Sequence, residues 1–185
     1  MKKIVQKEDA VLRKKAKEVL LSEIKNPKIK KILKEMSSAL KSQSDGVAIA
    51  APQIGYSLSI FLVSGKIFDK DFIENREDRF SEEKPMSDVK KITEQGKDFV
   101  FINTKISKLS RAKEWMPEGC LSVRWLYGKT YRSLKATVTA YDENGKKFTR
   151  GASGLLAQIF QHETDHLSGV LFIDHAKDIK EELPK

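Results

Sequence analysis

The chain has 185 residues and a formal net charge of +9, and 39% of its residues are hydrophobic and 33% charged. This composition is typical of a folded globular protein and excludes a largely disordered chain. No apolar run approaches the ~18 residues that a membrane helix needs. The N-terminal residues 1–8 include lysines but lack the apolar stretch of a signal peptide. We therefore expect a cytoplasmic protein that folds as a single domain.

The positive charge is concentrated in the first 41 residues, which are rich in lysine. A solvated lysine-rich surface accounts for it, and attraction to a polyanion such as ribosomal RNA is the alternative. No aromatic stacking residues are interleaved with these lysines. We therefore expect no sequence-specific nucleic-acid recognition.

The first predicted elements are a helix and a strand. Asn26 and Pro27 are typical of a helix start, and an apolar stripe at helical spacing then continues to about residue 42 through Ile29, Ile32, Leu33, Met36 and Leu40. A segment of small residues follows at 46–55, and residues 58–63 are predicted to form a strand.

Residues 64–98 mix acidic and basic side chains without clear periodicity. A stretch of this length is usually a functional loop or a disordered segment. We expect an exposed insertion there, with a short helix near residues 88–94.

The C-terminal half predicts strands and then a second helix. Residues 99–109, 134–141 and 146–150 are predicted strands, and Asn144-Gly145 predicts a tight hairpin turn with positive φ values. A helix is predicted over 155–166, with Gly169 as its stop. A helix, then antiparallel strands, then a helix indicates an α+β fold.

The motif His162-Glu163-Thr164-Asp165-His166 is the strongest chemical signal. On a helix His162 and His166 share a face and can bind one metal ion, and Glu163 can take a proton from a water that the metal activates. The ordinary alternative is two surface histidines beside a chance glutamate.

The third ligand distinguishes the enzyme classes that use this motif. A thermolysin-like protease needs a downstream glutamate on a further helix, and only 185 − 166 = 19 residues follow His166. A metzincin-like protease needs a third histidine where Phe172 stands, and His175 comes three residues too late. Both protease classes are disfavoured.

The remaining candidate ligand is Cys120, the one cysteine of the chain. A lone cysteine is often simply a small buried apolar residue. As a ligand it would complete a Cys-His-His set, which leaves a fourth position open, as catalytic sites do.

Three segments resemble the motifs of peptide deformylases in the right order: GVAIAAPQ (46–53), EGCLS (118–122) and QHETDH (161–166). The resemblance implies antiparallel sheets around a central metal-binding helix. It also implies hydrolytic removal of the formyl group from N-formylmethionine at the start of nascent proteins, with release of formate. Such proteins are bacterial in type, and an organellar or phage origin stays open.

The resemblance also implies residue roles. Cys120, His162 and His166 would bind one divalent metal ion, Fe(II) in the cell, with Zn, Ni or Co able to substitute. Glu163 would act as base and then acid, while Gln53 and the N–H of Leu121 would bind the oxyanion. Residues that would line the substrate pocket are Val47, Ala48, Met116, Gly119, Leu155 and Ile159. An ion pair between Glu118 and Arg132 would support the Cys120 loop, with Asp165 either a second support or an exposed carboxylate.

The chain departs from the family pattern in four places. Ala48 stands where a glycine is usual, Val123-Arg124-Trp125 replaces a proline-containing stretch, residues 64–98 are unusually long, and the family's C-terminal helix is abbreviated. Ala48 and the long segment favour one alternative, a metal amidase acting on a different small acyl amide. Another alternative is a basic, ribosome-associated protein with a vestigial site. We expect a monomer with no membrane partner.

Overall fold

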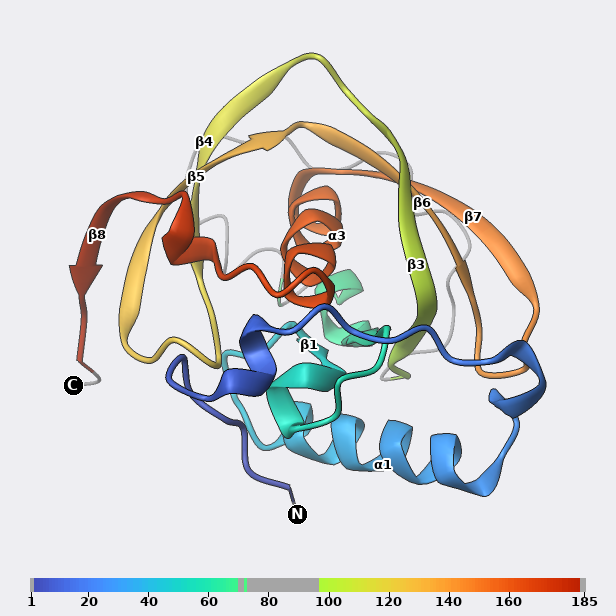
Figure 1. The fold of residues 1–185 in the computed structure, drawn as a ribbon. Coiled ribbons are helices and arrows are strands. Elements are labelled where there is room, and N and C mark those ends of the chain that lie inside the picture. The colour runs from blue at the N-terminus through green and yellow to red at the C-terminus, as the bar shows by residue number, and fades with distance from the viewer. Residues whose placement is uncertain (1, 70–71, 73–96, 184–185) are drawn as a thin grey trace.

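A computed structural model of the protein describes residues 2–69, 72 and 97–183 (Figure 1). Helix α3 (Gly154–Leu167) lies between two antiparallel sheets. Helix α1 (Pro27–Lys41) packs on the face of the larger sheet that points away from α3. The predicted α+β class, with antiparallel sheets around a central helix, is confirmed.

The larger sheet has the strand order β1-β2-β3-β6-β7, and the smaller has the order β4-β5-β8. The strands are β1 (Ala48–Ala50), β2 (Ile60–Val63), β3 (Phe99–Leu109), β4 (Lys113–Gly119), β5 (Leu126–Ser133), β6 (Lys135–Tyr141), β7 (Lys147–Ser153) and β8 (Lys177–Glu181). Short 3-10 helices are η1 (Ala10–Arg13), η2 (Leu21–Glu23), η3 (Ala51–Ile54), η4 (Gly65–Phe68) and η5 (Phe172–Asp174).

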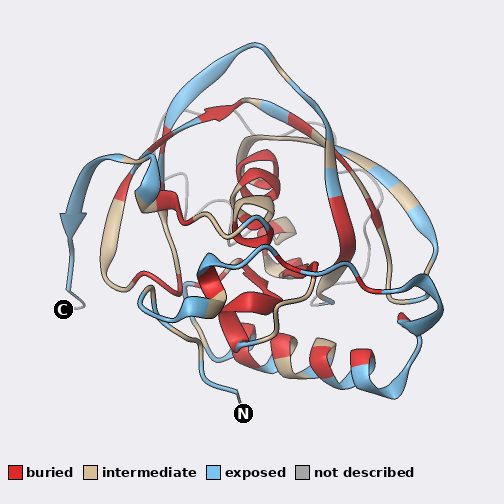
Figure 2. Ribbon diagram, in the orientation of Figure 1, coloured by how far each residue is buried: buried red, intermediate tan, exposed pale blue. Residues whose placement is uncertain are grey.

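The core between α3 and the larger sheet is built on aromatic rings. Phe61 and Phe101 stack with their centroids 4.7 Å apart, and Phe160 of α3 meets Phe101 edge-on at 5.2 Å. All three are almost fully buried, and Figure 2 colours much of α3 as buried. Burying each such side chain stabilises the fold by about 1.5–3 kcal/mol, so this contact fixes α3 firmly against the sheet.

Strand β2 shows why the sheet is apolar on both faces. Phe61 and Val63 face the α3 core, whereas Ile60 and Leu62 pack with the apolar stripe of α1. Both faces are covered, so the strand is a continuous apolar run. The predicted start of α1 is confirmed, because the Asn26 side chain accepts a hydrogen bond from the N–H of Lys28.

The hairpin between β6 and β7 differs from the predicted tight turn. Tyr141 pairs with Lys147, so five residues connect the strands, and only Gly145 of Asn144-Gly145 has a positive φ, +75°. The Asp142 carboxylate accepts from the N–H groups of Asn144 and Lys146 and closes the loop. The side-chain cap therefore replaces the second positive-φ residue of the predicted turn.

The prediction that residues 64–98 form an exposed insertion is wrong for the start of that segment. Residues 65–68 form η4, Gly65 and Ile67 are buried, and Phe72 packs against the α3 core. The predicted helix near 88–94 lies outside the described residues. Near the C-terminus, the segment after η5 forms strand β8, which pairs with β5. The resemblance implied an abbreviated helix there.

Among the residues described, no helix is long and apolar enough to cross a membrane.

Candidate metal centre and active site

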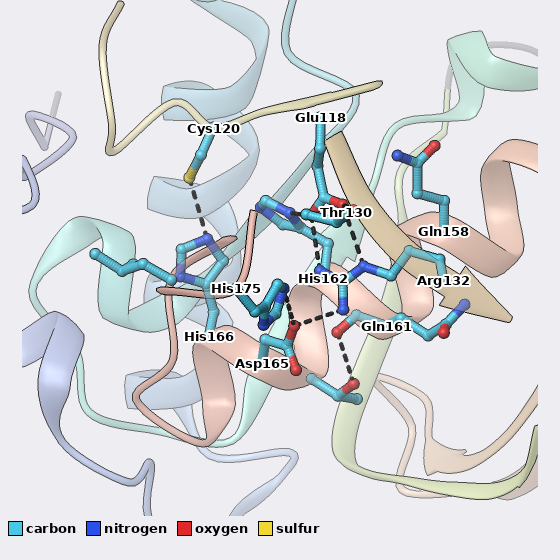
Figure 3. A network of polar contacts seen from close by, with 12 residues as sticks. Glu118, Cys120, Thr130, Arg132, Gln158, Gln161, His162, Asp165, His166 and His175 are labelled. Atoms are coloured by element: carbon cyan, nitrogen blue, oxygen red, sulfur yellow. Dashed lines mark hydrogen bonds and ion pairs between the residues drawn. The ribbon is translucent and has the colours of Figure 1, made fainter. Parts of the chain in front are cut away.

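Helix α3 and the loop after β4 bring together three side chains that could hold a metal ion. His162 and His166 lie one turn apart, with ring centroids 4.9 Å apart. Cys120 follows the last residue of β4, and its Sγ lies 3.2 Å from Nε2 of His166 (Figure 3). The ligand atoms of Cys120, His162 and His166 all lie within 4.8 Å of one another. The three predicted ligands are thus gathered around one point.

Glu118 sets the proton position on His162. Its carboxylate contacts Nδ1 of His162, and a carboxylate can only accept, so Nδ1 carries the hydrogen. Burial opposes protonation of His162, but Glu118 and Cys120 outweigh it and raise its pKa. A metal ion that binds Nε2 therefore displaces a proton there. Burial opposes ionisation of Glu118, but His162 and Arg132 outweigh it and hold the pKa of the Glu118 carboxyl well below its usual range.

The donor set fits a divalent transition metal. Burial lowers the pKa of His166 well below its usual value, which keeps this imidazole neutral and able to coordinate. One thiolate and two imidazoles suit iron, zinc, cobalt or nickel, and three protein ligands leave an open position. The residues present therefore fit a catalytic metal, although they do not select among these ions.

Arg132 donates hydrogen bonds to two carboxylates next to the candidate ligands, Glu118 and Asp165. Its Nη2 donates to Glu118 at 2.8 Å, its Nε donates to the same carboxylate at 3.1 Å, and its Nη1 donates to Asp165 at 2.6 Å. The predicted Glu118–Arg132 ion pair is confirmed, and Asp165 is part of the same network. Thr130 completes it by donating its hydroxyl to Glu118.

Glu163 is almost completely buried, at 3% exposure. Burial is the main reason that the pKa of its carboxyl rises to about 7. Its Oε2 has no hydrogen-bond partner within the described structure. A carboxyl in this state can both accept and release a proton near neutral pH.

Gln53 presents its amide to the cysteine loop. Its Oε1 accepts from the N–H of Ala50 at 2.7 Å, which turns Nε2 toward Cys120 Sγ, 3.6 Å away, and Ser122 Oγ, 3.2 Å away. The backbone of Leu121 is tied to the N-terminal segment by Gln6, which donates to its carbonyl at 3.1 Å. Gln53 and Leu121 both line the same cleft.

A cleft of about 730 Å³ opens onto these groups. Five of the six predicted pocket residues line it: Val47, Ala48, Gly119, Leu155 and Ile159. Met116 is buried on β4 and is not among the lining residues, whereas its neighbour Pro117 is. Gln158, which the sequence did not indicate, lines the cleft too.

Two small residues shape the cleft wall. A Cβ added to Gly119 would come within 2.7 Å of the Tyr127 ring, so the ring packs directly on the backbone there. Ala48 lies in β1, opposite Val63, and is not among the positive-φ residues. The backbone at this departure from the family pattern therefore does not need glycine.

Sequence reasoning missed one contact at the cleft. The Arg124 guanidinium donates to Asp45 through two nitrogens and to Gln43 Oε1 at 3.0 Å, and it covers the Trp125 ring at 4.6 Å. Arg124 and Asp45 line the cleft from different segments. Their separation of 79 residues gave no local signal.

Gln161 is the first residue of the QHETDH motif, but its side chain bonds the backbone of Ser133 and Ala157 instead of the candidate metal ligands. Its side chain accepts from the N–H of Ser133 and donates to the carbonyls of Ser133 and Ala157. It therefore anchors α3 to the end of β5.

Comparison with known proteins gives a consistent result. A family model described as polypeptide deformylase matches residues 1–182. Peptide deformylase 2 of Clostridium acetobutylicum is 36% identical over 168 residues, which are 90% of this chain and 89% of that protein.

Solved structures agree with the sequence matches. The peptide deformylase of Thermotoga maritima superposes with a TM-score of 0.74 at 28% identity and covers 96% of this chain and 98% of its own. A peptide deformylase from Synechococcus elongatus, solved in complex with actinonin, has a TM-score of 0.71 at 31% identity, covering 95% of this chain and 78% of that one.

Proposed function

This chain belongs to the peptide deformylase family, and we propose how its residues share the work of that reaction. The enzyme is a metal-dependent hydrolase that removes the formyl group from an N-terminal formylmethionine and releases formate. The observation that carries the assignment of roles is the position of Glu163. It is buried, its Oε2 has no hydrogen-bond partner among the described residues, and it lies on the same helix turn as the two histidines of the candidate metal site.

Cys120, His162 and His166 would hold one divalent ion, which we propose is Fe(II) in the cell, with Zn, Ni or Co able to replace it. When bound, the metal supplies Lewis-acid polarisation of the formyl oxygen and lowers the pKa of water. Glu118 supports this role by holding the Nδ1 side of His162, so that Nε2 is the atom that would bind the metal.

We assign proton transfer to Glu163. Burial keeps its pKa near 7, so the carboxylate accepts a proton from the attacking water and, as the acid, delivers it to the departing amine. Hydrolysis balances without another reactant, because water supplies the second oxygen of formate and the proton that Glu163 passes to the amine. Glu163 therefore acts first as base and then as acid.

Gln53 and the Leu121 N–H would stabilise the charge that develops on the formyl oxygen. The Ala50 contact fixes the Gln53 amide before substrate arrives, so little reorganisation accompanies the reaction. A preorganised donor of this kind contributes about 3 kcal/mol to catalysis. The residues Val47, Ala48, Leu155 and Ile159 would receive the methionine side chain in the cleft.

Formylated nascent peptides are the substrates of this family, and we propose that the enzyme meets them in the cytoplasm as a monomer. A lone cysteine, and hence no internal disulfide, suits a reducing compartment. The net charge of +9 supports association with the ribosome. The alternatives of a different acyl amidase or a vestigial site are not favoured, because the ligand set and Glu163 are all present.

Anaerobic assays with formyl-Met-Ala-Ser test these roles. Glu163→Gln should keep the metal content of the parent enzyme and slow formate release by roughly 10²–10⁴-fold, the usual share of acid–base catalysis. Glu114→Gln, at an exposed position near the start of β4, is the matched control and should leave the rate unchanged. Parent-like turnover by Glu163→Gln would rule out the proposed role.

A further inference from the structure

The three-stranded sheet displays aromatic rings and lysines together on its outer side. Trp115 of β4 and Tyr131 of β5 are paired in the ladder with ring centroids 5.3 Å apart, and they are 43% and 53% exposed. Lys177 of β8 places its Nζ 4.7 Å from the Trp115 ring centroid, and Lys113 places its Nζ 5.9 Å from that of Tyr131. We call Lys113, Trp115, Lys129, Tyr131 and Lys177 the aromatic–lysine face.

The alternation of the strands points this face away from the residues that support the metal ligands. Met116 and Glu118 on β4, and Thr130 and Arg132 on β5, are buried on the side that holds the metal ligands. Because side chains alternate along a strand, Lys113 and Trp115 on β4 and Lys129 and Tyr131 on β5 point to the opposite side of the sheet. Figure 2 shows β8 and most of β4 as exposed. The aromatic–lysine face therefore takes no part in supporting the metal ligands.

Stability alone does not explain the composition of this face. Lys129 and Lys177 are directly paired across β5 and β8, and like charges in such a pair destabilise a sheet. Asp178 lies 3.6 Å from Lys129 and offsets part of this charge. Large exposed aromatic rings beside such lysines are typical of a binding surface.

We propose that the aromatic–lysine face binds single-stranded RNA. Unpaired bases stack on exposed aromatic rings, and lysines around the rings meet the phosphates. The positive face and the net charge of +9 complement this polyanion. An acidic peptide would satisfy the lysines alone, whereas the paired rings of Trp115 and Tyr131 suit flat bases.

The position of the face links it to the cleft. Tyr127 lies two residues before Lys129 on β5 and lines the cleft, as does Pro117, two residues after Trp115 on β4. RNA held on the aromatic–lysine face would lie beside the cleft mouth. This inference adds a binding function to the hydrolase and does not depend on the roles proposed for its catalytic residues.

Fluorescence anisotropy of the metal-loaded full chain with a labelled oligouridylate, roughly 12 nucleotides long, tests the proposal. Trp115→Ala with Tyr131→Ala should weaken binding on the order of tenfold or more, whereas Trp115→Phe with Tyr131→Phe should retain most of the affinity. Replacing Lys113, Lys129 and Lys177 by Gln should lower the slope of log affinity against log salt by about 2.

The matched control replaces three exposed lysines of α1, Lys28, Lys31 and Lys34, by Gln, which removes the same charge elsewhere. All variants should still release formate from formyl-Met-Ala-Ser, which reports an intact fold. The proposal is overturned if the α1 variant loses as much affinity as the sheet variant, or if the double alanine variant binds like the parent. Equal competition by polyglutamate, or equal affinity for duplex RNA, would also overturn it.

Discussion

The Arg132 guanidinium donates a 2.8 Å hydrogen bond to the carboxylate of Glu118, and both side chains are buried. The same carboxylate receives the Nδ1–H of His162. The Glu118 carboxylate on β4 thus fixes the tautomer of His162, one of the proposed metal ligands on α3. Support of this kind usually makes a ligand more basic and better oriented.

Glu118→Gln should lower metal affinity by roughly 10–100-fold. The amide can still accept from His162, but it loses the charge that favours the bound imidazole, and among the described residues Arg132 keeps Asp165 as its charged partner. Chelator competition measures the affinity, and Glu114→Gln, an exposed glutamate near the start of β4, is the control. Unchanged affinity in Glu118→Gln would contradict a role in supporting the metal.

Gln53→Ala should lower kcat by about 10²–10³-fold, with metal content unchanged. The substitution removes the donor that faces the ligand loop and leaves the Ala50 N–H without its acceptor. Ser122→Ala is the control, because it removes only the neighbour that Gln53 contacts at 3.2 Å. Steady-state formate release separates the two, and equal losses in both variants would show that the Gln53 donor has no special role.

Gly169→Ala should destabilise the fold more than Gly145→Ala. Both glycines have similar φ values, +77° and +75°, which cost an alanine on the order of 1 kcal/mol. A Cβ at position 169 would also lie 2.7 Å from the carbonyl oxygen of Arg13, whereas at position 145 the nearest atom is 4.0 Å away. Urea unfolding measures the difference. Equal losses would mean that the loop after α3 moves to accommodate the methyl group.

Asp45→Asn should reduce the free energy of unfolding at pH 7 by roughly 0.5–1 kcal/mol, a value limited by solvent screening. The hydrogen bond from Arg124 is the main reason that the pKa of Asp45 lies below its ordinary value of 3.8. A lowered folded-state pKa gives stability that is complete above pH 3.8 and is lost as the pH falls through the folded value. Urea unfolding of both proteins between pH 7 and pH 2 should therefore converge at the acid end. A difference that persists there would have another cause.

The sequence predicted the elements whose buried residues repeat at a regular spacing. The stripe of α1, the apolar run of β2 and the amphipathic α3 were all found, because one covered face imposes regular apolar spacing. Strands β4 and β5 were missed. Their inward positions include Glu118, Thr130 and Arg132, so the buried side is polar and the alternation does not show in the sequence.

The site was predicted where its residues are close in sequence. His162, Glu163 and His166 form one motif, and Cys120 was reached because the chain offers one cysteine. The contacts that link distant segments could not be predicted this way. Arg132 to Asp165 and Arg124 to Asp45 join residues 33 and 79 positions apart, and no spacing rule relates them.

The sequence by itself determined the kind of chemistry, because helical periodicity puts both imidazoles and Glu163 on neighbouring positions of one turn. The tertiary structure decided how that chemistry is tuned. Only folding brings Glu118 against His162, buries Glu163 until its pKa rises to about 7, and turns the Gln53 amide toward Cys120. Only pairing of β4, β5 and β8 places Trp115 and Tyr131 beside Lys177, because a sheet joins residues that are far apart in the chain.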